Sequence, residues 1–249
     1  MSTTVIIQAR MGSSRLPGKI LLPLGTDTVL AQVIKRVSAA KGVDRIVIAT
    51  TDQPNDDAVV AEAQRIGVDF FRGSESDVLA RYYDAARHFN CDIIVRVTSD
   101  CPLYDPTLLT KMLKKFNNWI ETKAPVDYFS NTLTRSYPRG LDTEIFRMGA
   151  LENIYQSATS LAEREHVTPY FYRNPALFNI EEQIGTPDLS NHRWTLDTDE
   201  DYRFIQTVFK KLEDPSGTLF STNQLLELLE QRPDIMVINS KVQQKPISH

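Results

Sequence analysis

The sequence predicts an α/β fold with a doubly wound, mostly parallel sheet that carries helices on both faces. Short apolar runs alternate with amphipathic helical segments through the first half of the chain, as in repeated βαβ units. The apolar runs are nearly continuous, which is typical of parallel strands buried on both faces. Polar residues follow three of these runs, at the end where such sheets bind ligands. The 249 residues suggest a single domain over 1–249.

Each expected element follows from its residue pattern. The strands are runs rich in Val and Ile, and the helices repeat apolar residues at intervals of three and four. Gly67 follows the second helix, where a left-handed residue ends a helix at low cost. Beyond residue 120 the alternation becomes less regular. In chain order, we expect a strand over 5–9, a helix over 29–40, a strand over 44–51, a helix over 56–66, a strand over 68–71, a helix over 77–89 and a strand over 92–98.

The loop after the first strand is the most informative segment of the chain. It carries Arg10, Arg15 and Lys19 within ten positions, and cations at this density repel one another unless an anion joins them. This combination predicts a triphosphate-binding loop, although its spacing is not that of a Walker motif. The alternative is a surface turn with incidental charges. The small residues that let the backbone approach phosphate oxygens and form a concave nest are Gly12, Ser13, Ser14 and Gly18.

Two aspartates are candidate ligands for a metal ion beside this loop. Asp100 follows the strand over 92–98, and Mg²⁺ binds one or two carboxylates together with phosphate oxygens. Asp197 is the best candidate for a second carboxylate, because it also follows a short apolar stretch and precedes a helix. Its alternative role is that of a helix N-cap. We expect the acids that follow it to be solvated first-turn charges: Asp199, Glu200 and Asp201.

Composition and charge restrict the functional classes. The formal net charge is −4 and no basic stripe is interleaved with aromatic residues, so we expect no binding to nucleic acid. The two cysteines indicate neither a disulfide framework nor a zinc site. The sequence enters a strand within its first residues and has no apolar run long enough to cross a bilayer. We therefore expect no membrane insertion and a cytoplasmic location.

Several motifs together resemble those of the sugar cytidylyltransferases. The segment Gln8-Ala-Arg-Met-Gly-Ser-Ser-Arg-Leu-Pro-Gly-Lys19 is similar to the signature of that superfamily. The resemblance is strongest to the branch typified by spore coat polysaccharide biosynthesis protein F, which is similar to 3-deoxy-manno-octulosonate and acylneuraminate cytidylyltransferases. It covers roughly residues 4 to 205 through the further segments 49–52, 72–81, 100–103, 130–133, 137–144, 163–169 and 193–198.

The resemblance implies a nucleotide-diphospho-sugar transferase-like, Rossmann-like fold that binds CTP. It implies that Arg10, Arg15 and Lys19 act as catalytic residues, which bind the triphosphate and neutralise the departing pyrophosphate. Asp100 and Asp197 would hold Mg²⁺ as the cofactor. The complete nucleotide-binding set that it implies is Ala9, Arg10, Gly12, Ser13, Ser14, Arg15, Lys19, Gly73, Asp77, Arg81 and Asp100.

The loop from Gly73 to Arg81 would lie over the cytidine. Each of its two charged candidates has an ordinary structural alternative. Asp77 is also a good first residue for a helix, and Arg81 could be a solvated charge on that helix.

The region of roughly 120–190 would form the acceptor pocket and the contact of a homodimer. His166 is a weak candidate for a general base, because a lone histidine is more often structural, and Glu144 is an equally weak one. The acceptor-binding candidates are Arg139, Asp142, Glu144, Arg164, Glu165 and His166.

Alternatives remain for the charged residues of that region. Asp142 and Glu144 would share one face of a strand, which either lines the pocket or is a solvent-facing edge strand. Arg139 and Arg164 could pair with an anionic acceptor or with neighbouring acids.

The function implied is Mg²⁺-dependent transfer of CMP from CTP to a sugar or sugar acid, with release of pyrophosphate, for surface polysaccharide biosynthesis. One alternative is a glycosyltransferase on the same core, although Asp100 is followed by Cys-Pro rather than by a second acid. Another is a non-catalytic nucleotide-binding protein. The joint presence of Lys19, Asp100 and Asp197 speaks against that alternative.

Overall fold

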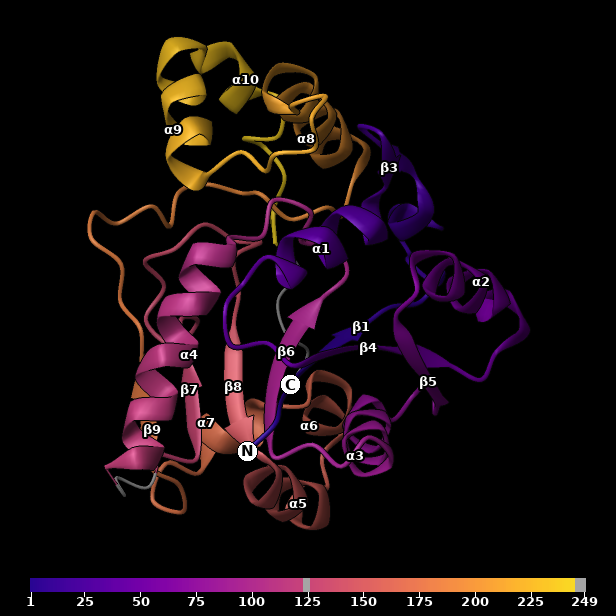
Figure 1. Cartoon of the computed structure of the whole chain (residues 1–249), viewed down its shortest axis with the longest axis vertical. Helices are drawn as coiled ribbons and strands as arrows, with labels where there is room; N and C mark the ends of the chain where they lie inside the picture. Colours follow the sequence, from indigo (N-terminus) through magenta and orange to yellow (C-terminus); the bar gives the residue numbers. More distant parts are fainter. Residues whose placement is uncertain (123–125, 245–249) are drawn as a thin grey trace.

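The computed structural model describes residues 1–122 and 126–244. Its centre is a seven-stranded sheet in the order β5-β4-β1-β6-β8-β7-β9 (Figure 1). Among the described residues, β8 runs against its neighbours β6 and β7, whereas the other pairs are parallel. The prediction of a mostly parallel sheet is therefore confirmed. The strands are β1 (Thr3–Gln8), β4 (Arg45–Thr51), β5 (Asp69–Gly73), β6 (Ile93–Thr98), β7 (Tyr128–Ser130), β8 (Glu144–Arg147) and β9 (Ile180–Glu182).

Helices cover both faces of this sheet, as the sequence predicts. The C-terminal helices α8, α9 and α10 gather at one end of the molecule (Figure 1). The α-helices are α1 (Val29–Ser38), α2 (Asp57–Ile66), α3 (Val78–His88), α4 (Pro106–Glu121), α5 (Met148–Ser157), α6 (Leu161–His166), α7 (Pro169–Arg173), α8 (Asp199–Leu212), α9 (Thr222–Gln231) and α10 (Pro233–Val237). Short 3-10 turns at Lys19–Leu21 and Pro54–Asp56 and a hairpin of β2 (Pro23–Leu24) with β3 (Asp27–Thr28) complete the elements.

Strand β1 shows how alternate side chains build two cores. Val5 and Ile7 point into a hydrophobic cluster with α1, α2, α4 and α8. Ile6 points to the opposite face, into a cluster with α3, α5 and α7. All three side chains are fully buried, and two-sided burial explains why the sequence of this strand is a continuous apolar run.

The predicted boundaries in the first half agree closely with the structure. The four expected strands and three expected helices are all present, and their ends shift by two residues or fewer. Gly67 ends α2 in the left-handed conformation with a φ of 81°, as expected. The parallel pairing places Gln8 beside Ala49 and Thr98. The polar residues after β1, β4 and β6 therefore meet at one edge of the sheet.

Two statements about the second half are wrong: the edge-strand alternative for Asp142 and Glu144, and their shared strand face. β8, which begins at Glu144, is not a solvent-facing edge strand, because it lies between β6 and β7. Asp142 precedes this strand and does not share a strand face with Glu144. Pairing with β6 buries Glu144 to 5% exposure.

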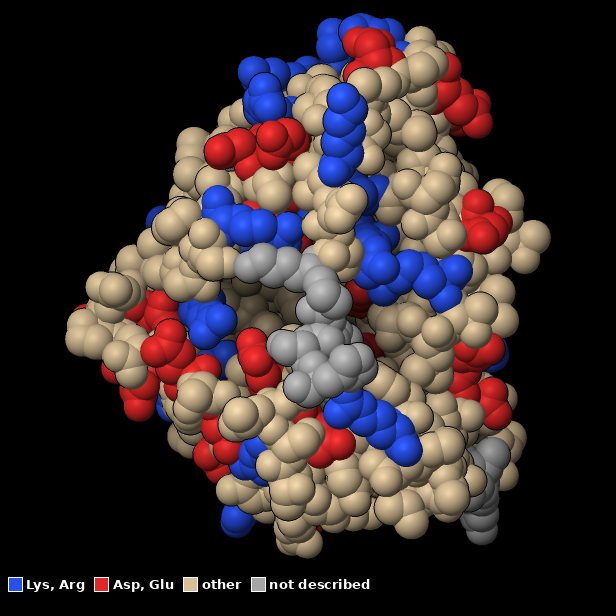
Figure 2. Space-filling model, turned by 180° about the vertical axis from the view of Figure 1, so that it is seen from behind, with Lys and Arg blue, Asp and Glu red and all other residues tan. Residues whose placement is uncertain are grey.

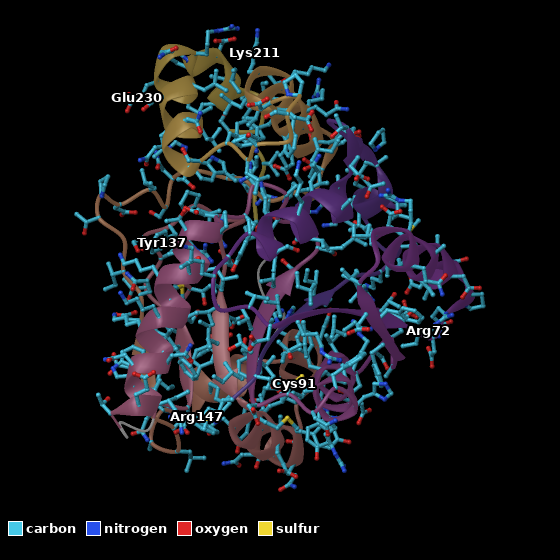
Figure 3. The ribbon with its side chains drawn as sticks, viewed as in Figure 1. Arg72, Cys91, Tyr137, Arg147, Lys211 and Glu230 are labelled. Carbon is cyan, nitrogen blue, oxygen red and sulfur yellow. The ribbon has the colours of Figure 1, made fainter. Side chains whose placement is uncertain are left out.

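The remaining sequence expectations concern cysteines and membrane helices. Cys91 and Cys101 are both buried and form no disulfide, and Cys91 lies inside the molecule near α3 (Figure 3). Within 1–122 and 126–244, no helix has both the length and the apolar character needed to cross a membrane.

Candidate active site

A large open cavity lies at the polar edge of the sheet. Its volume is about 970 Å³. The face of the molecule turned away in Figure 1 is hollowed near its centre, and side chains of both charges gather there (Figure 2). Eight residues predicted from the sequence line the cavity: Arg15, Asp100, Arg139, Asp142, Glu144, Glu165, His166 and Asp197.

Lys19 lies beside this cavity between the two candidate metal ligands. Its Nζ is 3.0 Å from Asp100 Oδ2 and 2.8 Å from Asp197 Oδ1. It also donates to the carbonyl oxygen of Leu196 at 2.6 Å. Although burial disfavours the charged form, the two carboxylates raise the pKa of Lys19. Burial likewise opposes ionisation of Asp100, yet Lys19 and the Thr98 hydroxyl hold the pKa of Asp100 below its usual value.

Asp197 receives further cations on its second oxygen. Asp197 Oδ2 is 2.9 Å from Arg15 Nη2 and 2.9 Å from Arg193 Nη2. The N-cap of α8 is Thr198, whose hydroxyl accepts from the backbone N–H of Asp201. The N-cap alternative for Asp197 is therefore wrong, and its carboxylate faces the site.

The expectation that Asp201 is a solvated charge is also wrong. Its side chain is fully buried and bonds to Arg193 through both oxygens, at 2.9 Å each. Asn239 Nδ2 and the backbone N–H of Asp197 also donate to it, at 2.9 and 3.0 Å. The capping box turns Asp201 back toward the helix start, where the guanidinium of Arg193 compensates its charge. Sequence inspection missed Arg193, although it lies in the segment 193–198.

The phosphate-loop candidates surround a backbone turn at the end of β1. Ala9 is buried, and its N–H donates to the carbonyl of Ala49. Arg10 is exposed and lies 3.6 Å from Glu75. The turn closes where the N–H of Gly18 donates to the carbonyl of Met11 at 3.0 Å. Gly12, Ser13, Ser14 and Arg15 lie within it.

A buried carboxylate that sequence inspection missed supports this turn. Asp56 Oδ1 accepts from the backbone N–H of Met11 at 2.6 Å, and its other oxygen accepts from the Thr51 hydroxyl. Asp56 is only 3% exposed. Asp56 could have been noticed as an acid that follows the polar end of β4. Its partner, the N–H of Met11, lies 45 residues away in the sequence, so no local pattern indicates the contact.

The segment from Gly73 to Arg81 borders the same region from α3. Asp77 caps α3 by accepting from Ala80, as its structural alternative predicts, and also bonds to Arg164. Arg81 is not a solvated charge, because it is 2% exposed and donates to the carbonyl of Ser74 at 2.7 Å. Burial lowers the pKa of Arg81. A side chain at Gly73 would come within 3.2 Å of Arg81.

The acceptor candidates divide into paired and unpaired groups. Glu144 bonds to Arg96 and accepts from Tyr128 at 2.6 Å. Asp142 forms a two-pronged pair with Arg135, at 2.9 and 3.0 Å. Both carboxylates therefore have their charge compensated within the protein.

Arg139, Arg164 and His166 differ in their availability. Arg164 is held by Asp77 and by the carbonyl of Tyr155, and it does not line the cavity. Arg139 lines it without an ion pair to any carboxylate in the described ranges. Burial and nearby Arg135 lower the pKa of Arg139. Burial also lowers the pKa of His166, which favours the neutral imidazole.

A match to a known protein family shows the family of this chain. The cytidylyltransferase model matches residues 4–238. The chain belongs to the cytidylyltransferase family. It is therefore a nucleotidyltransferase. The resemblance to the sugar cytidylyltransferases that the sequence motifs indicate is confirmed. Membership in this family favours this interpretation over a glycosyltransferase or a non-catalytic nucleotide-binding protein.

Individual relatives and solved structures are similar to this chain over most of its length. The chain is 35% identical over 243 residues to spore coat polysaccharide biosynthesis protein SpsF of Bacillus subtilis, covering 92% of this chain and 94% of that protein. A solved cytidylyltransferase from Leptospira borgpetersenii is 36% identical, with a TM-score of 0.88 over 100% of both chains. A CMP:2-keto-3-deoxy-manno-octonic acid synthetase complexed with CTP has a TM-score of 0.61 at 21% identity. That likeness covers 85% of this chain and 99% of the other, and shows a shared fold.

The buried Asp201 carboxylate generates a stability prediction. Asp201→Ala removes the fully buried partner of Arg193, which then keeps only its contact with Asp197. Loss of one member of a buried pair costs about 3–5 kcal/mol. We expect urea denaturation to show a loss of that order. The matched control is Asp199→Ala, which removes an exposed acid from the same helix turn and should cost about 0.5 kcal/mol or less. Equal losses in the two variants would contradict the assignment.

Proposed function

We propose that this cytidylyltransferase transfers CMP from CTP to a sugar or sugar acid and releases pyrophosphate, in a Mg²⁺-dependent reaction of surface polysaccharide biosynthesis. The observation that carries the proposal is the position of Lys19 between Asp100 and Asp197 at the polar edge of the sheet. Cations and hard oxygen ligands meet there, as the handling of a triphosphate requires. Since the reaction consumes CTP, we propose that it occurs in the cytoplasm.

The reaction makes one bond and breaks one. An acceptor oxygen bonds to the α-phosphorus of CTP, and the bond from that phosphorus to the oxygen that bridges it to the β-phosphorus breaks. That oxygen leaves with the pyrophosphate, and an acceptor hydroxyl gives its proton to a base. Such reactions depend mainly on positioning and on neutralising charge. Arg10, Arg15 and Lys19 would neutralise the departing pyrophosphate, with the nest of the loop around its oxygens.

The oxygens around Lys19 fit a divalent metal ion. Two carboxylates and one backbone carbonyl converge on a single point, and hard oxygens of these kinds are the ligands that Mg²⁺ prefers. Asp100 and Asp197 would hold the ion. When bound, Mg²⁺ would supply positive charge that stabilises the phosphate oxygens in the transition state.

The contacts of Glu144 favour His166 as the candidate for a general base. Glu144 is engaged by Arg96 and Tyr128, so His166 is the better candidate. Its lowered pKa keeps it neutral and able to accept a proton near pH 7. Asp142 and Glu165 would bind acceptor hydroxyls along the cavity wall.

The triphosphate assignment predicts a loss of activity in two variants. Lys19→Ala and Asp100→Ala should each lower the rate of pyrophosphate release from CTP by at least about a hundredfold. Lys19 would neutralise the charge of the leaving pyrophosphate, and Asp100 would hold the metal ion that stabilises the phosphate oxygens. The control is Lys41→Ala, which removes an exposed lysine and should retain the wild-type rate. A wild-type rate in either site variant would refute the role of that residue.

We expect Arg139 to bind a negatively charged group of the acceptor. Its guanidinium pairs with no carboxylate within 1–122 and 126–244, so we propose that an anionic acceptor supplies one. Arg139→Gln should raise the KM for a sugar acid at least about tenfold, since a hydrogen bond to a charged group contributes about 1.5–3 kcal/mol. The KM for CTP should not change. An unchanged KM for every sugar acid turned over would exclude Arg139 from acceptor binding.

A homodimer through the region 120–190 remains our proposal. Leu161 and Leu177 lie in that region and are 88% and 62% exposed, which suits a buried contact. Light scattering should therefore give a mass of about twice 28.3 kDa. The double variant Leu161→Arg, Leu177→Arg should shift the mass toward the monomer. Val237→Arg, at another exposed apolar position, should not. A monomeric wild type would contradict the proposal.

A further inference from the structure

The Lys19 ammonium occupies a complete oxygen site. It has three N–H donors. Among the residues that the structure describes, the three oxygens within hydrogen-bond reach of it belong to Asp100, Leu196 and Asp197, at 3.0, 2.6 and 2.8 Å. The Lys19 side chain is 12% exposed. In this arrangement all three donors are used, so Lys19 has none left for a phosphate.

The oxygen site is held together independently of Lys19. The N–H of Leu196 donates to the carbonyl of Asp100 at 2.8 Å, and the Thr195 hydroxyl donates to the same carbonyl at 3.2 Å. These bonds join the segment after β6 to the segment before α8. The two carboxylates therefore stay close to each other when Lys19 leaves, and their mutual repulsion then requires another cation.

The two arginines that contact Asp197 bind outside this oxygen site. Arg15 and Arg193 both bond to Asp197 Oδ2, whereas Lys19 bonds to Oδ1. The two guanidiniums therefore do not occupy the space between the carboxylates. A lysine suits that space, because it is a compact charge on a flexible stem and can move away.

We propose that Asp100 Oδ2, Asp197 Oδ1 and the Leu196 carbonyl form one cation site, which holds either the Lys19 ammonium or a divalent ion, but not both. The nucleotide-free protein keeps Lys19 there and binds divalent ions weakly. A triphosphate offers Lys19 another anion, so nucleotide binding and divalent-ion binding strengthen each other. This inference rests on the proposed function for the nature of the nucleotide, and it adds the Leu196 carbonyl as a ligand.

The test is Mn²⁺ binding to the nucleotide-free protein, measured by electron paramagnetic resonance of the free ion. Lys19→Met keeps the apolar stem and removes the charge, so Mn²⁺ should bind at least about tenfold more tightly than to the wild type. The matched control, Arg15→Met, removes a cation from the other oxygen of Asp197. It leaves Lys19 in place and should gain much less. Adding Asp100→Asn to Lys19→Met should abolish the gain.

Mn²⁺ binding to Lys19→Met that is no tighter than to the wild type would overturn the proposal. A second measurement uses the wild-type protein and avoids any folding defect. Acetylation of Lys19, followed by mass spectrometry with exposed Lys41 as the internal reference, should increase when saturating Mn²⁺ is added. Unchanged acetylation would also overturn the proposal. Neither measurement uses CTP or turnover. A failure of this proposal can therefore be distinguished from a failure of the proposed function.

Discussion

One ammonium group between two carboxylates connects three parts of the chain that are distant in sequence. Lys19 follows the loop after β1, Asp100 follows β6, and Asp197 precedes α8. Two carboxylates this close would repel each other without a cation between them. The site therefore depends on a positive charge at this point, and the parallel pairing of β1 with β6 provides the frame for it.

A second layer of buried charges supports this centre. Arg193 binds Asp197 and is itself fixed by the fully buried Asp201. Asn239, which follows α10, donates to Asp201 and to the carbonyl of Arg193. The C-terminal helical region thus contributes to the site by fixing the arginine that contacts Asp197. Asp56 in turn fixes the backbone of the loop after β1. Both supports use a buried carboxylate, and in both cases its hydrogen bonds are satisfied within the protein.

Much of the fold could be predicted, because the first half of the chain has a simple periodicity. Strands buried on both faces, such as β1, appear as continuous apolar runs, and their order along the chain indicates βαβ units. The expectation that their polar ends meet follows from parallel pairing alone. The second half was harder, because its strands are short and β8 is inserted between β6 and β7 out of sequence order.

Residues of the candidate site could be predicted where their local sequence marks them. They were harder to predict where their role depends on contacts with residues distant in the sequence. Asp100 and Asp197 each follow an apolar segment, and Lys19 belongs to a loop that is dense in cations. The structure brings the three residues together. Asp201 appears in sequence as one of several first-turn acids, and only its contacts with Arg193 and Asn239 distinguish it. The pairing of Arg164 with Asp77 spans 87 residues. No local pattern reports such a partner.

We propose that the oxygens now around Lys19 hold the metal ion when CTP is bound. The most direct test is a crystal structure with CTP and Mn²⁺, in which anomalous scattering locates the ion. We expect Mn²⁺ on Asp100 and Asp197, with the Lys19 ammonium moved to a phosphate oxygen. An ion bound elsewhere, with Lys19 still between the two carboxylates, would contradict it.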